Sequence, residues 1–217
     1  MDVTTNLPVL NPVELRVLGT LIEKCKTTPD YYPMTLNSLV AACNQKTSRK
    51  PVTNYNEETV VTALDSLRKM GLTSTATGGT SRSIKYKHNF TLVFPMTSAE
   101  LSVLCLLFLR GPQTVGELNT NSARLYEFES LEEVVLVTDK LSHTDVPFIK
   151  QLPKRPGQKE ARFAHLFGET IEFEEEDQPE ESSVKNISDL ETRLSLVENE
   201  LAIVKESLAK LMKELMG

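Results

Sequence analysis

Apolar residues within positions 1–95 recur three and four residues apart in three separate stretches, which is the spacing of helices that bury one face. Asn11, Thr35 and Asn56 stand where these stretches begin, and their side chains can accept hydrogen bonds from open backbone amides. The pattern therefore predicts three short helices. Their apolar stripes are Val13, Val17, Leu18, Leu21 and Ile22 in the first helix, Leu36, Leu39, Val40 and Cys43 in the second, and Val60, Val61, Leu64 and Leu67 in the third.

A two-stranded ribbon is predicted after the third helix. Gly71 follows the last apolar position and is typical of a helix end. Residues 72–75 and 84–87 have the composition of strands, and the segment Thr77-Gly78-Gly79-Thr80 between them can form a hairpin turn. Three helices followed by such a ribbon form the layout of a winged helix, in which a helix-turn-helix and a hairpin present one surface to a partner.

The same plan occurs a second time along the chain. Residues 10–18 (LNPVELRVL) match residues 96–104 (MTSAELSVL), and weaker echoes of 35–39 and 57–61 follow in the same order. A second ribbon is predicted over 148–152 and 161–166, turning at Pro156-Gly157. The predicted fold class is therefore mainly α with small β-hairpins (α+β). It comprises two tandem winged-helix (helix-turn-helix) domains, residues 1–95 and 96–168.

The end of the chain has a different character. Residues 169–183 (ETIEFEEEDQPEESS) are acidic and poor in apolar residues, as in a flexible linker. Residues 184–217 then carry an unbroken heptad pattern, which predicts a coiled-coil helix and a homodimer. A single amphipathic helix that folds back on the globular part is the alternative. The heptad core positions are Ile187, Leu190, Leu194, Val197, Leu201, Val204, Leu208, Leu211 and Leu215.

Composition places the protein among ordinary soluble globular chains. Of its 217 residues, 40% are hydrophobic and 25% are charged. No apolar run is long enough to cross a bilayer, so we expect no membrane partner. The start MDVTTNLPVLNP lacks the basic and apolar regions of a signal peptide, and the three cysteines are scattered in apolar contexts. We therefore expect a cytoplasmic protein with reduced thiols.

Charge is distributed unevenly along the chain. Residues 1–95 hold 11 Lys and Arg against 7 Asp and Glu, residues 96–169 hold 8 against 10, and residues 170–217 hold 5 against 13. Only the first predicted domain, with an excess of four positive charges, has the sign that favours a polyanion.

Several unusual motifs together resemble the YceH-like family of uncharacterised bacterial proteins. The resemblance covers about residues 10–168, and it implies two winged-helix domains, a bacterial cytoplasmic setting and no established activity. In the positions after Gly116-Glu117-Leu118, this chain has Asn119 and Asn121 where the family usually has arginines. The motifs are Glu23-Lys24, Thr27-Thr28-Pro29, Tyr32-Pro33, ACNQKT at 42–47, Arg49, Pro51-Val52, Leu109-Arg110-Gly111, Gln113-Thr114, RLYEF at 124–128, Pro156-Gly157, Glu160, Arg162 and HLF at 165–167.

The polar loop before the third helix is the first candidate contact site. Lys46, Arg49 and Lys50 could reach phosphates, while Asn44, Gln45 and Asn54 could contact base edges. The alternative is an ordered loop whose amides bind its own backbone and whose cations are solvated. The sequence leaves both interpretations open.

The first ribbon is the second candidate. Arg82, Lys85 and Lys87 would suit a wing that lies along a phosphate backbone, although lysines also protect an exposed strand edge. The third helix itself argues against reading DNA, because Glu57 and Glu58 at its start would repel phosphates. A similar basic tip is predicted around the second turn, at Lys154, Arg155, Lys159 and Arg162.

No pattern in the chain indicates catalysis. The three histidines are far apart, no nucleophile motif or glycine-rich phosphate loop occurs, and we expect no metal, no cofactor and no enzyme activity. The leading hypothesis is a DNA-binding transcriptional regulator that uses residues 44–54 and the wing at 80–88. The alternative is a protein–protein interaction scaffold that does not bind nucleic acid.

Overall fold

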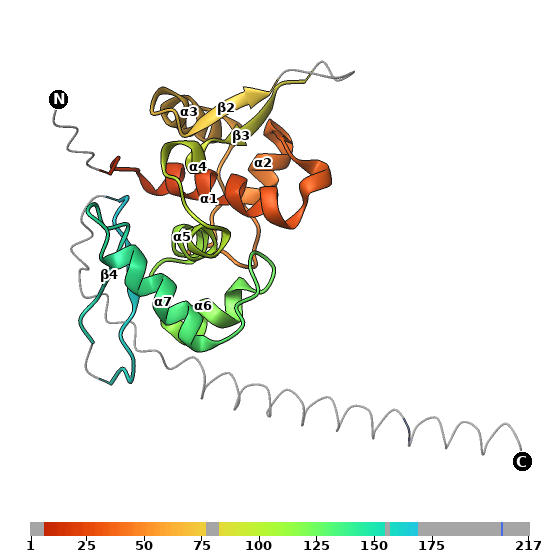
Figure 1. Cartoon of the computed structure of the whole chain (residues 1–217). Helices are drawn as coiled ribbons and strands as arrows, with labels where there is room; N and C mark the ends of the chain where they lie inside the picture. Colours follow the sequence, from red (N-terminus) through yellow and green to blue (C-terminus); the bar gives the residue numbers. More distant parts are fainter. Residues whose placement is uncertain (1–6, 77–82, 155–156, 169–204, 206–217) are drawn as a thin grey trace, which may run out of the picture. The chain divides into compact units, whose positions relative to one another are not determined.

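The computed structural model of the chain describes residues 7–76, 83–154, 157–168 and 205 (Figure 1). The first half contains the three predicted helices and the predicted ribbon, each within two residues of the expected bounds. Caps explain these bounds, because the side chains of Asn11, Thr35 and Asn56 accept backbone N–H groups at the three helix starts. The elements are α1 (Pro12–Thr27), α2 (Leu36–Cys43), α3 (Glu57–Lys69), β2 (Thr73–Ala76) and β3 (Lys85–His88).

Three short elements of this half were not predicted. Strand β1 (Met34–Thr35) pairs antiparallel with β3, which gives a sheet of order β1-β3-β2. A 3₁₀ turn, η1 (Pro29–Tyr31), precedes β1, and a one-turn helix, α4 (Phe90–Val93), follows β3. These elements are too short to show an apolar period in sequence.

The second half repeats the order of helices and hairpin. Strand β5 pairs antiparallel with β4 and also with Gln113, which takes the place that β1 holds in the first half. The α+β class is confirmed, and the element order of each half is consistent with a winged helix. The elements are α5 (Ser98–Arg110), α6 (Val115–Ser122), α7 (Leu131–Ser142), β4 (Ile149–Gln151) and β5 (Phe163–His165).

Helices α1 and α5 start with the same local structure. Asn11 and Glu14 form a capping box at α1, and Thr97 and Glu100 form one at α5. The two boxes lie 86 residues apart, which is the offset of the sequence repeat. The local chemistry of the helix start is therefore part of what the duplication preserves.

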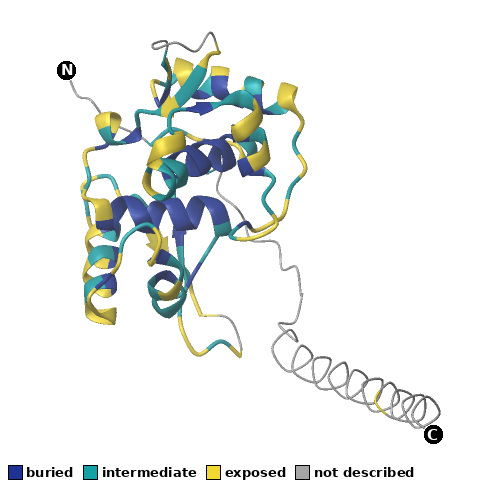
Figure 2. Cartoon of the chain, turned by 90° about the vertical axis from the view of Figure 1, so that its right-hand side faces the viewer, coloured by how far each residue is buried: buried dark blue, intermediate teal, exposed yellow. Residues whose placement is uncertain are grey.

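The core lies between the two halves as well as inside each of them. Helices α1 and α5 pack against one another, and one hydrophobic cluster includes residues of both halves. Figure 2 shows two dark blue, buried helices lying across the middle of the described part. The two predicted winged-helix domains thus lie within one compact unit, Met1–Ile171.

Aromatic rings fill one side of this junction. Phe90 packs against Phe94 and against Phe108 of α5, and all three rings pack against Phe167, with ring centroids 5.2–5.8 Å apart. The backbone closes the same region, since Leu10 N–H donates to the Phe167 carbonyl at 2.6 Å. Residues at the start and the end of the described part are therefore held together by the core.

The predicted acidic linker (169–183) and the predicted coiled coil (184–217) lie outside the described residues, apart from Lys205. Within the described ranges, every helix falls short of the length and apolar character that crossing a bilayer requires.

Candidate functional site

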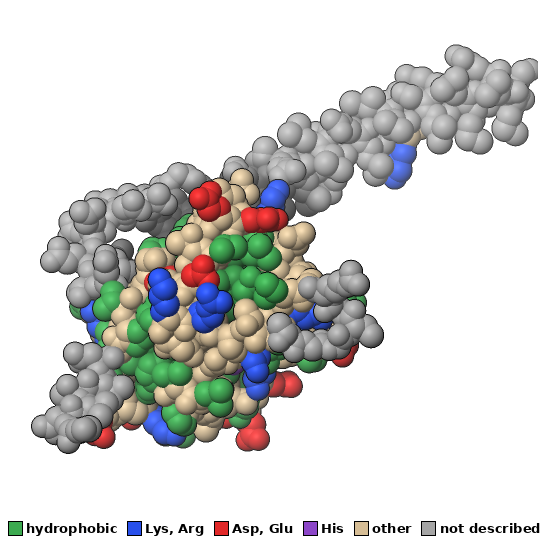
Figure 3. Space-filling model, turned by 90° about the horizontal axis from the view of Figure 1, so that it is seen from above, with side chains coloured by type: hydrophobic (Ala, Val, Ile, Leu, Met, Phe, Trp, Pro, Cys, Tyr) green, Lys and Arg blue, Asp and Glu red, His purple; other side chains and the backbone are tan. Residues whose placement is uncertain are grey.

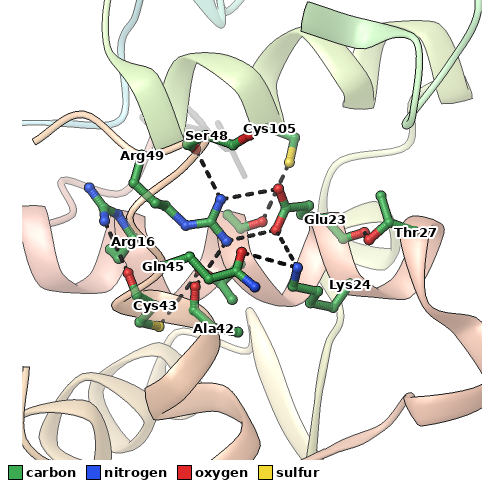
Figure 4. A network of polar contacts seen from close by, with 12 residues as sticks. Arg16, Glu23, Lys24, Thr27, Ala42, Cys43, Gln45, Ser48, Arg49 and Cys105 are labelled. Carbon is green, nitrogen blue, oxygen red and sulfur yellow. Dashed lines mark hydrogen bonds and ion pairs between the residues drawn. The ribbon is translucent and has the colours of Figure 1, made fainter. Parts of the chain in front are cut away.

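The loop between α2 and α3 is anchored by a buried ion pair (Figure 4). The Arg49 side chain is fully buried, and its guanidinium forms a two-pronged pair with the carboxylate of Glu23 at 2.6 and 3.1 Å. It also donates to the carbonyls of Ala42 and Ser48, each at 3.0 Å. Burial alone would raise the pKa of Glu23, but the hydrogen bonds and charge of Arg49 outweigh it, and the pKa is lowered. Arg49 therefore stabilises the fold in this structure and is not presented to a partner.

A second buried arginine, which the sequence analysis did not identify, holds the other end of the loop. Arg16 of α1 is 3% exposed. Its guanidinium donates to the carbonyls of Cys43 at 3.1 Å and Pro51 at 2.6 Å, and to the Thr53 hydroxyl at 3.3 Å. Arg16 lies on the side of α1 away from the predicted apolar stripe, so the periodicity carried no signal for its burial. A buried cation must find acceptors inside the protein, and Arg16 finds them in this loop.

Two of the three carboxamides predicted as contacts in the loop, Asn44 and Gln45, are also engaged internally. Asn44 binds both sides of one backbone unit, since its Nδ2 donates to the Tyr55 carbonyl at 2.8 Å and its Oδ1 accepts the Tyr55 N–H at 2.7 Å. Gln45 Oε1 accepts from Lys24 Nζ at 3.2 Å. These contacts agree with the interpretation in which the amides bind the protein itself.

The length of the loop is explained by a bridge to the second half. Lys50 N–H donates to the Leu109 carbonyl near the end of α5 at 2.9 Å. Arg110 donates to the Ser48 hydroxyl at 3.0 Å. A turn of three or four residues between two helices would not reach α5. The additional residues therefore connect the helix-turn-helix of the first half to the shared core.

The structure does not bring the predicted contact residues together. Lys46, Lys50 and Asn54 are exposed on the loop, which in Figure 1 turns down toward α5. Strands β2 and β3 extend away at the top of the same view, where Lys87 is exposed and Lys85 is half-buried. Arg82 lies outside the described residues. Loop and wing therefore form two separate basic areas.

The charge pattern on the wing side is mixed. Figure 3 looks down on the top of Figure 1, and on this face the Lys and Arg side chains do not form one continuous area. They are separated by hydrophobic, neutral and acidic side chains. The outer face of α3 has the same character, with Glu57, Glu58 and Asp65 exposed and Asp65 paired with Arg68 at 2.9 Å.

The second half contains a groove that the sequence analysis missed. It is a cavity of about 740 Å³ between α7, the start of α6 and the β4–β5 ribbon. Leu131 and Val135, on the outer side of α7, form one wall and are 46% and 48% exposed. Its other apolar lining residues are Val115, Pro147, Ile149, Ala161, Phe163 and Leu166.

A signal for this groove is present in the sequence of α7. Val134, Thr138 and Leu141 face the core of this half, whereas Leu131, Val135 and Leu136 are exposed. At 100° per residue, Leu131 and Val135 adjoin the core-facing residues Val134 and Thr138 on α7, so the apolar stripe is wider than the part that the core covers. The exposed part of this stripe indicates a helix that can contact something besides its own core.

Charged groups stand around the groove. Lys150 and Lys154 lie on the ribbon side, and Asp139 on α7 has its carboxylate 3.1 Å from His143 Nδ1. Glu160 also lines the groove. Of the predicted basic tip, Arg155 lies outside the described residues, and Arg162 is paired with Glu117 at 2.8 Å.

The His and Cys side chains of the described residues do not gather in one cluster. No group of three or more His, Cys, Asp or Glu among them is arranged to hold a metal ion. The two histidines whose pKa is strongly lowered, His88 and His165, owe this chiefly to burial and lie in the packed sheet regions. All three cysteines are free thiols, and Cys43 and Cys105 are buried as expected.

A family model and several related proteins match most of this chain. Residues 10–158 match the model of the family described as "Protein of unknown function, DUF480". A UPF0502 protein of Shewanella halifaxensis is 43% identical over 211 residues, which are 94% of this chain and 98% of the relative. A UPF0502 protein of Solibacter usitatus is 46% identical over 198 residues, covering 91% and 94% of the two chains. One of Opitutus terrae is 47% identical over 169 residues, covering 76% and 72%.

Proposed function

This chain belongs to the DUF480 family of uncharacterised proteins, and we propose that it is a protein-interaction module whose main binding surface is the groove of its second half. The observation that supports this function is the pair of exposed apolar side chains, Leu131 and Val135, which line the cavity from α7. Apolar side chains in a concave site gain free energy when a partner removes them from water. The proposal assigns no reaction and no cofactor to the protein.

The position of α7 strengthens the argument. In each half, the third helix (α3 or α7) is the one that a DNA-binding helix-turn-helix would place in the major groove, with Arg, Lys, Asn or Gln toward the bases. Helix α7 instead begins with Leu131, Glu132 and Glu133. Two carboxylates and an apolar side chain at this end favour a protein surface over a phosphate backbone.

The predicted coiled coil adds to this function. If residues 184–217 join two copies, as their heptads predict, each dimer would present two grooves to its partners. Two linked sites raise the effective concentration of a partner that carries two binding segments. We therefore propose that the protein is a homodimeric scaffold. We propose the cytoplasm as its location.

DNA binding is the second candidate, and one observation favours it. Lys46, Lys50 and Lys87 are exposed, and among the described residues none of them takes part in an ion pair. Free cations of this kind supply non-specific affinity for a polyanion. Their separation into a loop and a wing is the reason why we rank this function second.

Site-directed photo-crosslinking in cells tests the protein-interaction function. A photoreactive residue at Val135 in the groove should give a discrete crosslinked partner. The same residue at Thr62, on the exposed side of α3, serves as the control and should not capture that partner. The captured complex should then be reconstituted from purified proteins, and Val135→Glu should weaken it at least tenfold while leaving the thermal unfolding temperature unchanged. Equal binding by Val135→Glu and wild type would overturn the proposed site.

The DNA candidate is tested in parallel by fluorescence anisotropy. Labelled duplexes of mixed sequence are titrated with wild type and with Lys46→Ala/Lys50→Ala/Lys87→Ala at low and moderate salt. If protein binding is the function, we expect weak affinity for the duplexes and little difference between wild type and the triple variant. A steep loss of affinity with salt that disappears in the triple variant would move DNA to first place.

A further inference from the structure

We infer that the partner enters the groove as an extended segment that adds a strand to the free edge of β4, carrying apolar residues at alternate positions with at least one carboxylate beside them. This inference rests on the proposed function and names the class of partner for the same site. It is carried by the hydrogen-bond register of the β4–β5 ribbon, the apolar lining beside it and the charges at its rim.

The register shows which backbone groups of β4 are used. Leu166 N–H donates to the Phe148 carbonyl at 2.9 Å, and Leu152 N–H donates to the Arg162 carbonyl at 2.8 Å. In an antiparallel pair, residues alternate between those that bond to the neighbour and those that point away from it. Since Ile149 pairs opposite His165 and Gln151 opposite Phe163, the N–H and carbonyl groups of Ile149 and Gln151 point to the outer edge.

The opposite edge of the ribbon supports this assignment. Phe163 points outward from β5 by the same alternation, and it exchanges two hydrogen bonds with Gln113, at 2.8 and 3.1 Å. The β5 edge is therefore filled by the chain itself. Within the described part of the chain, no backbone group bonds to the outward N–H groups of Ile149 and Gln151.

The free edge and the apolar wall belong to the same cavity. Ile149, Lys150 and Gln151 line it from the strand, and Leu131 and Val135 line it from α7. A peptide that pairs with β4 would point every second side chain to one face of the sheet. Main-chain hydrogen bonds would then hold the segment, and the apolar wall would select its alternate side chains, as in other strand-addition complexes.

The charged side chains at the rim of the groove are the reason why we expect a carboxylate in the segment. The four charged side chains that line the cavity, Asp139, Lys150, Lys154 and Glu160, sum to zero, but Asp139 lies on α7 with His143 at 3.1 Å. Lys150 and Lys154 lie on the ribbon side, and among the described residues neither forms an ion pair. A carboxylate beside the apolar residues would complement Lys150 or Lys154.

Synthetic peptides test the mode of binding directly on the full-length protein. The probe is a short fluorescent peptide in which Val and Ile alternate with Thr and Glu. The N–H groups of the bound peptide lie on two edges, one toward β4 and one away from it. N-methylation on the edge toward β4 removes the hydrogen-bond donors to β4, whereas N-methylation on the other edge leaves those donors in place. We expect one of the two methylated peptides to lose roughly tenfold or more in affinity and the other to bind like the parent. Equal affinity of both methylated peptides would overturn strand addition.

Two proline variants provide the matched test on the protein. Gln151→Pro removes the outward N–H of β4 without removing a hydrogen bond of the β4–β5 ladder, because a proline is tolerated where the N–H faces away from the neighbouring strand. It should reduce binding of the parent peptide by roughly tenfold. Gln151→Val changes the same side chain but keeps the N–H, so it should lose less affinity than Gln151→Pro. Thr75→Pro removes the N–H at the equivalent outward position of the first sheet and should bind normally.

The charge requirement and the proposed function are tested by separate arms. Replacement of Glu by Lys in the peptide should weaken binding, and Lys150→Glu/Lys154→Glu should reverse that preference. If Val135→Glu abolishes binding of the crosslinked partner but Gln151→Pro does not, the groove is the site and strand addition is wrong. If neither variant affects that partner, the proposed function itself fails.

Discussion

Cys105 Sγ lies 3.4 Å from the carbonyl oxygen of Gly19, and the two residues are 86 positions apart, which is the offset of the internal repeat. Equivalent positions of the two halves therefore meet where α1 and α5 cross. Gly19 also lies against Phe108 and Leu109 of α5, so the two helices pack closely at this point.

This crossing predicts that Gly19 is intolerant of a side chain. A Cβ at this position would lie 3.0 Å from both Leu109 Cδ2 and Phe108 Cβ. Gly19→Ala should therefore lower the free energy of unfolding by about 1–3 kcal/mol, in spite of the better helix propensity of alanine. Urea unfolding followed by circular dichroism measures this change.

Gly116 of α6 is the matched control for that variant. A Cβ there would meet only Thr114 Oγ1, at 3.9 Å. Gly116→Ala should therefore leave stability unchanged or raise it by up to about 1 kcal/mol. A Gly19→Ala protein that is as stable as Gly116→Ala would contradict close packing of α1 on α5.

The buried pair of Arg49 and Glu23 predicts a large effect of a single substitution. Arg49→Met removes the two-pronged partner of the largely buried Glu23 carboxylate and leaves it only Lys24, at 3.2 Å, so the free energy of unfolding should fall by about 3 kcal/mol. Arg68→Met is the control, because its pair with Asp65 has the same type of contact but side chains that are 57% and 53% exposed. That variant should cost at most about 1 kcal/mol. Similar losses in the two variants would show that the loop does not depend on Arg49.

Asn44 is predicted to act on stability more than on partner binding. Asn44→Ala removes both hydrogen bonds to the Tyr55 backbone and should lower the free energy of unfolding by about 1–3 kcal/mol. Lys46→Ala changes an exposed neighbour in the same loop and should leave thermal unfolding unaffected. The prediction is wrong if Asn44→Ala unfolds like wild type in a thermal scan.

Two buried histidines predict a loss of stability in mild acid. Burial lowers the pKa of His88 and of His165 to about 4, and the charge of Lys26 adds to the effect at His88. Because the folded pKa lies below the ordinary value of 6.5, the unfolded chain binds more protons in this range. The contribution to stability is complete above pH 6.5 and is lost progressively as the pH falls toward 4.

His165→Phe isolates one of these two contributions. Phenylalanine should keep the edge contact of the ring with Phe108, whose centroid is 5.2 Å away, and it does not titrate. Between pH 6.5 and 4.5 this variant should lose up to about 2 kcal/mol less than wild type in urea unfolding. Parallel curves for His165→Phe and wild type would disprove the role of burial.

The heptad pattern predicts the oligomeric state. Deletion of residues 184–217 should convert a dimer to a monomer, and Leu201→Lys at a core heptad position should do the same in the full chain. Light scattering coupled to size exclusion measures both masses. A full-length chain that is already monomeric, or a truncated chain that remains dimeric, would remove the coiled-coil hypothesis.

Local sequence alone was sufficient for most of the secondary structure. The bounds of α1, α2 and α3 follow from Asn11, Thr35 and Asn56 and from apolar residues within one or two turns of them. Caps and helical periodicity act over a few residues, so they can be read from a stretch of chain. The repeat of residues 10–18 at 96–104 added that the α+β plan of three helices and a hairpin occurs twice.

Contacts between distant residues decided the rest. Whether Arg49 was a solvated cation or a buried anchor depended on Glu23, which is 26 positions away and on another helix. The groove likewise depends on α7, the start of α6 and the ribbon meeting in space, although Leu131 and Val135 were visible in the sequence as part of a wide apolar stripe on one helix. Burial of a charge or exposure of an apolar side chain is a property of what surrounds it. The tertiary structure therefore made the basic loop a structural bridge and formed a cavity with exposed apolar side chains in the second half.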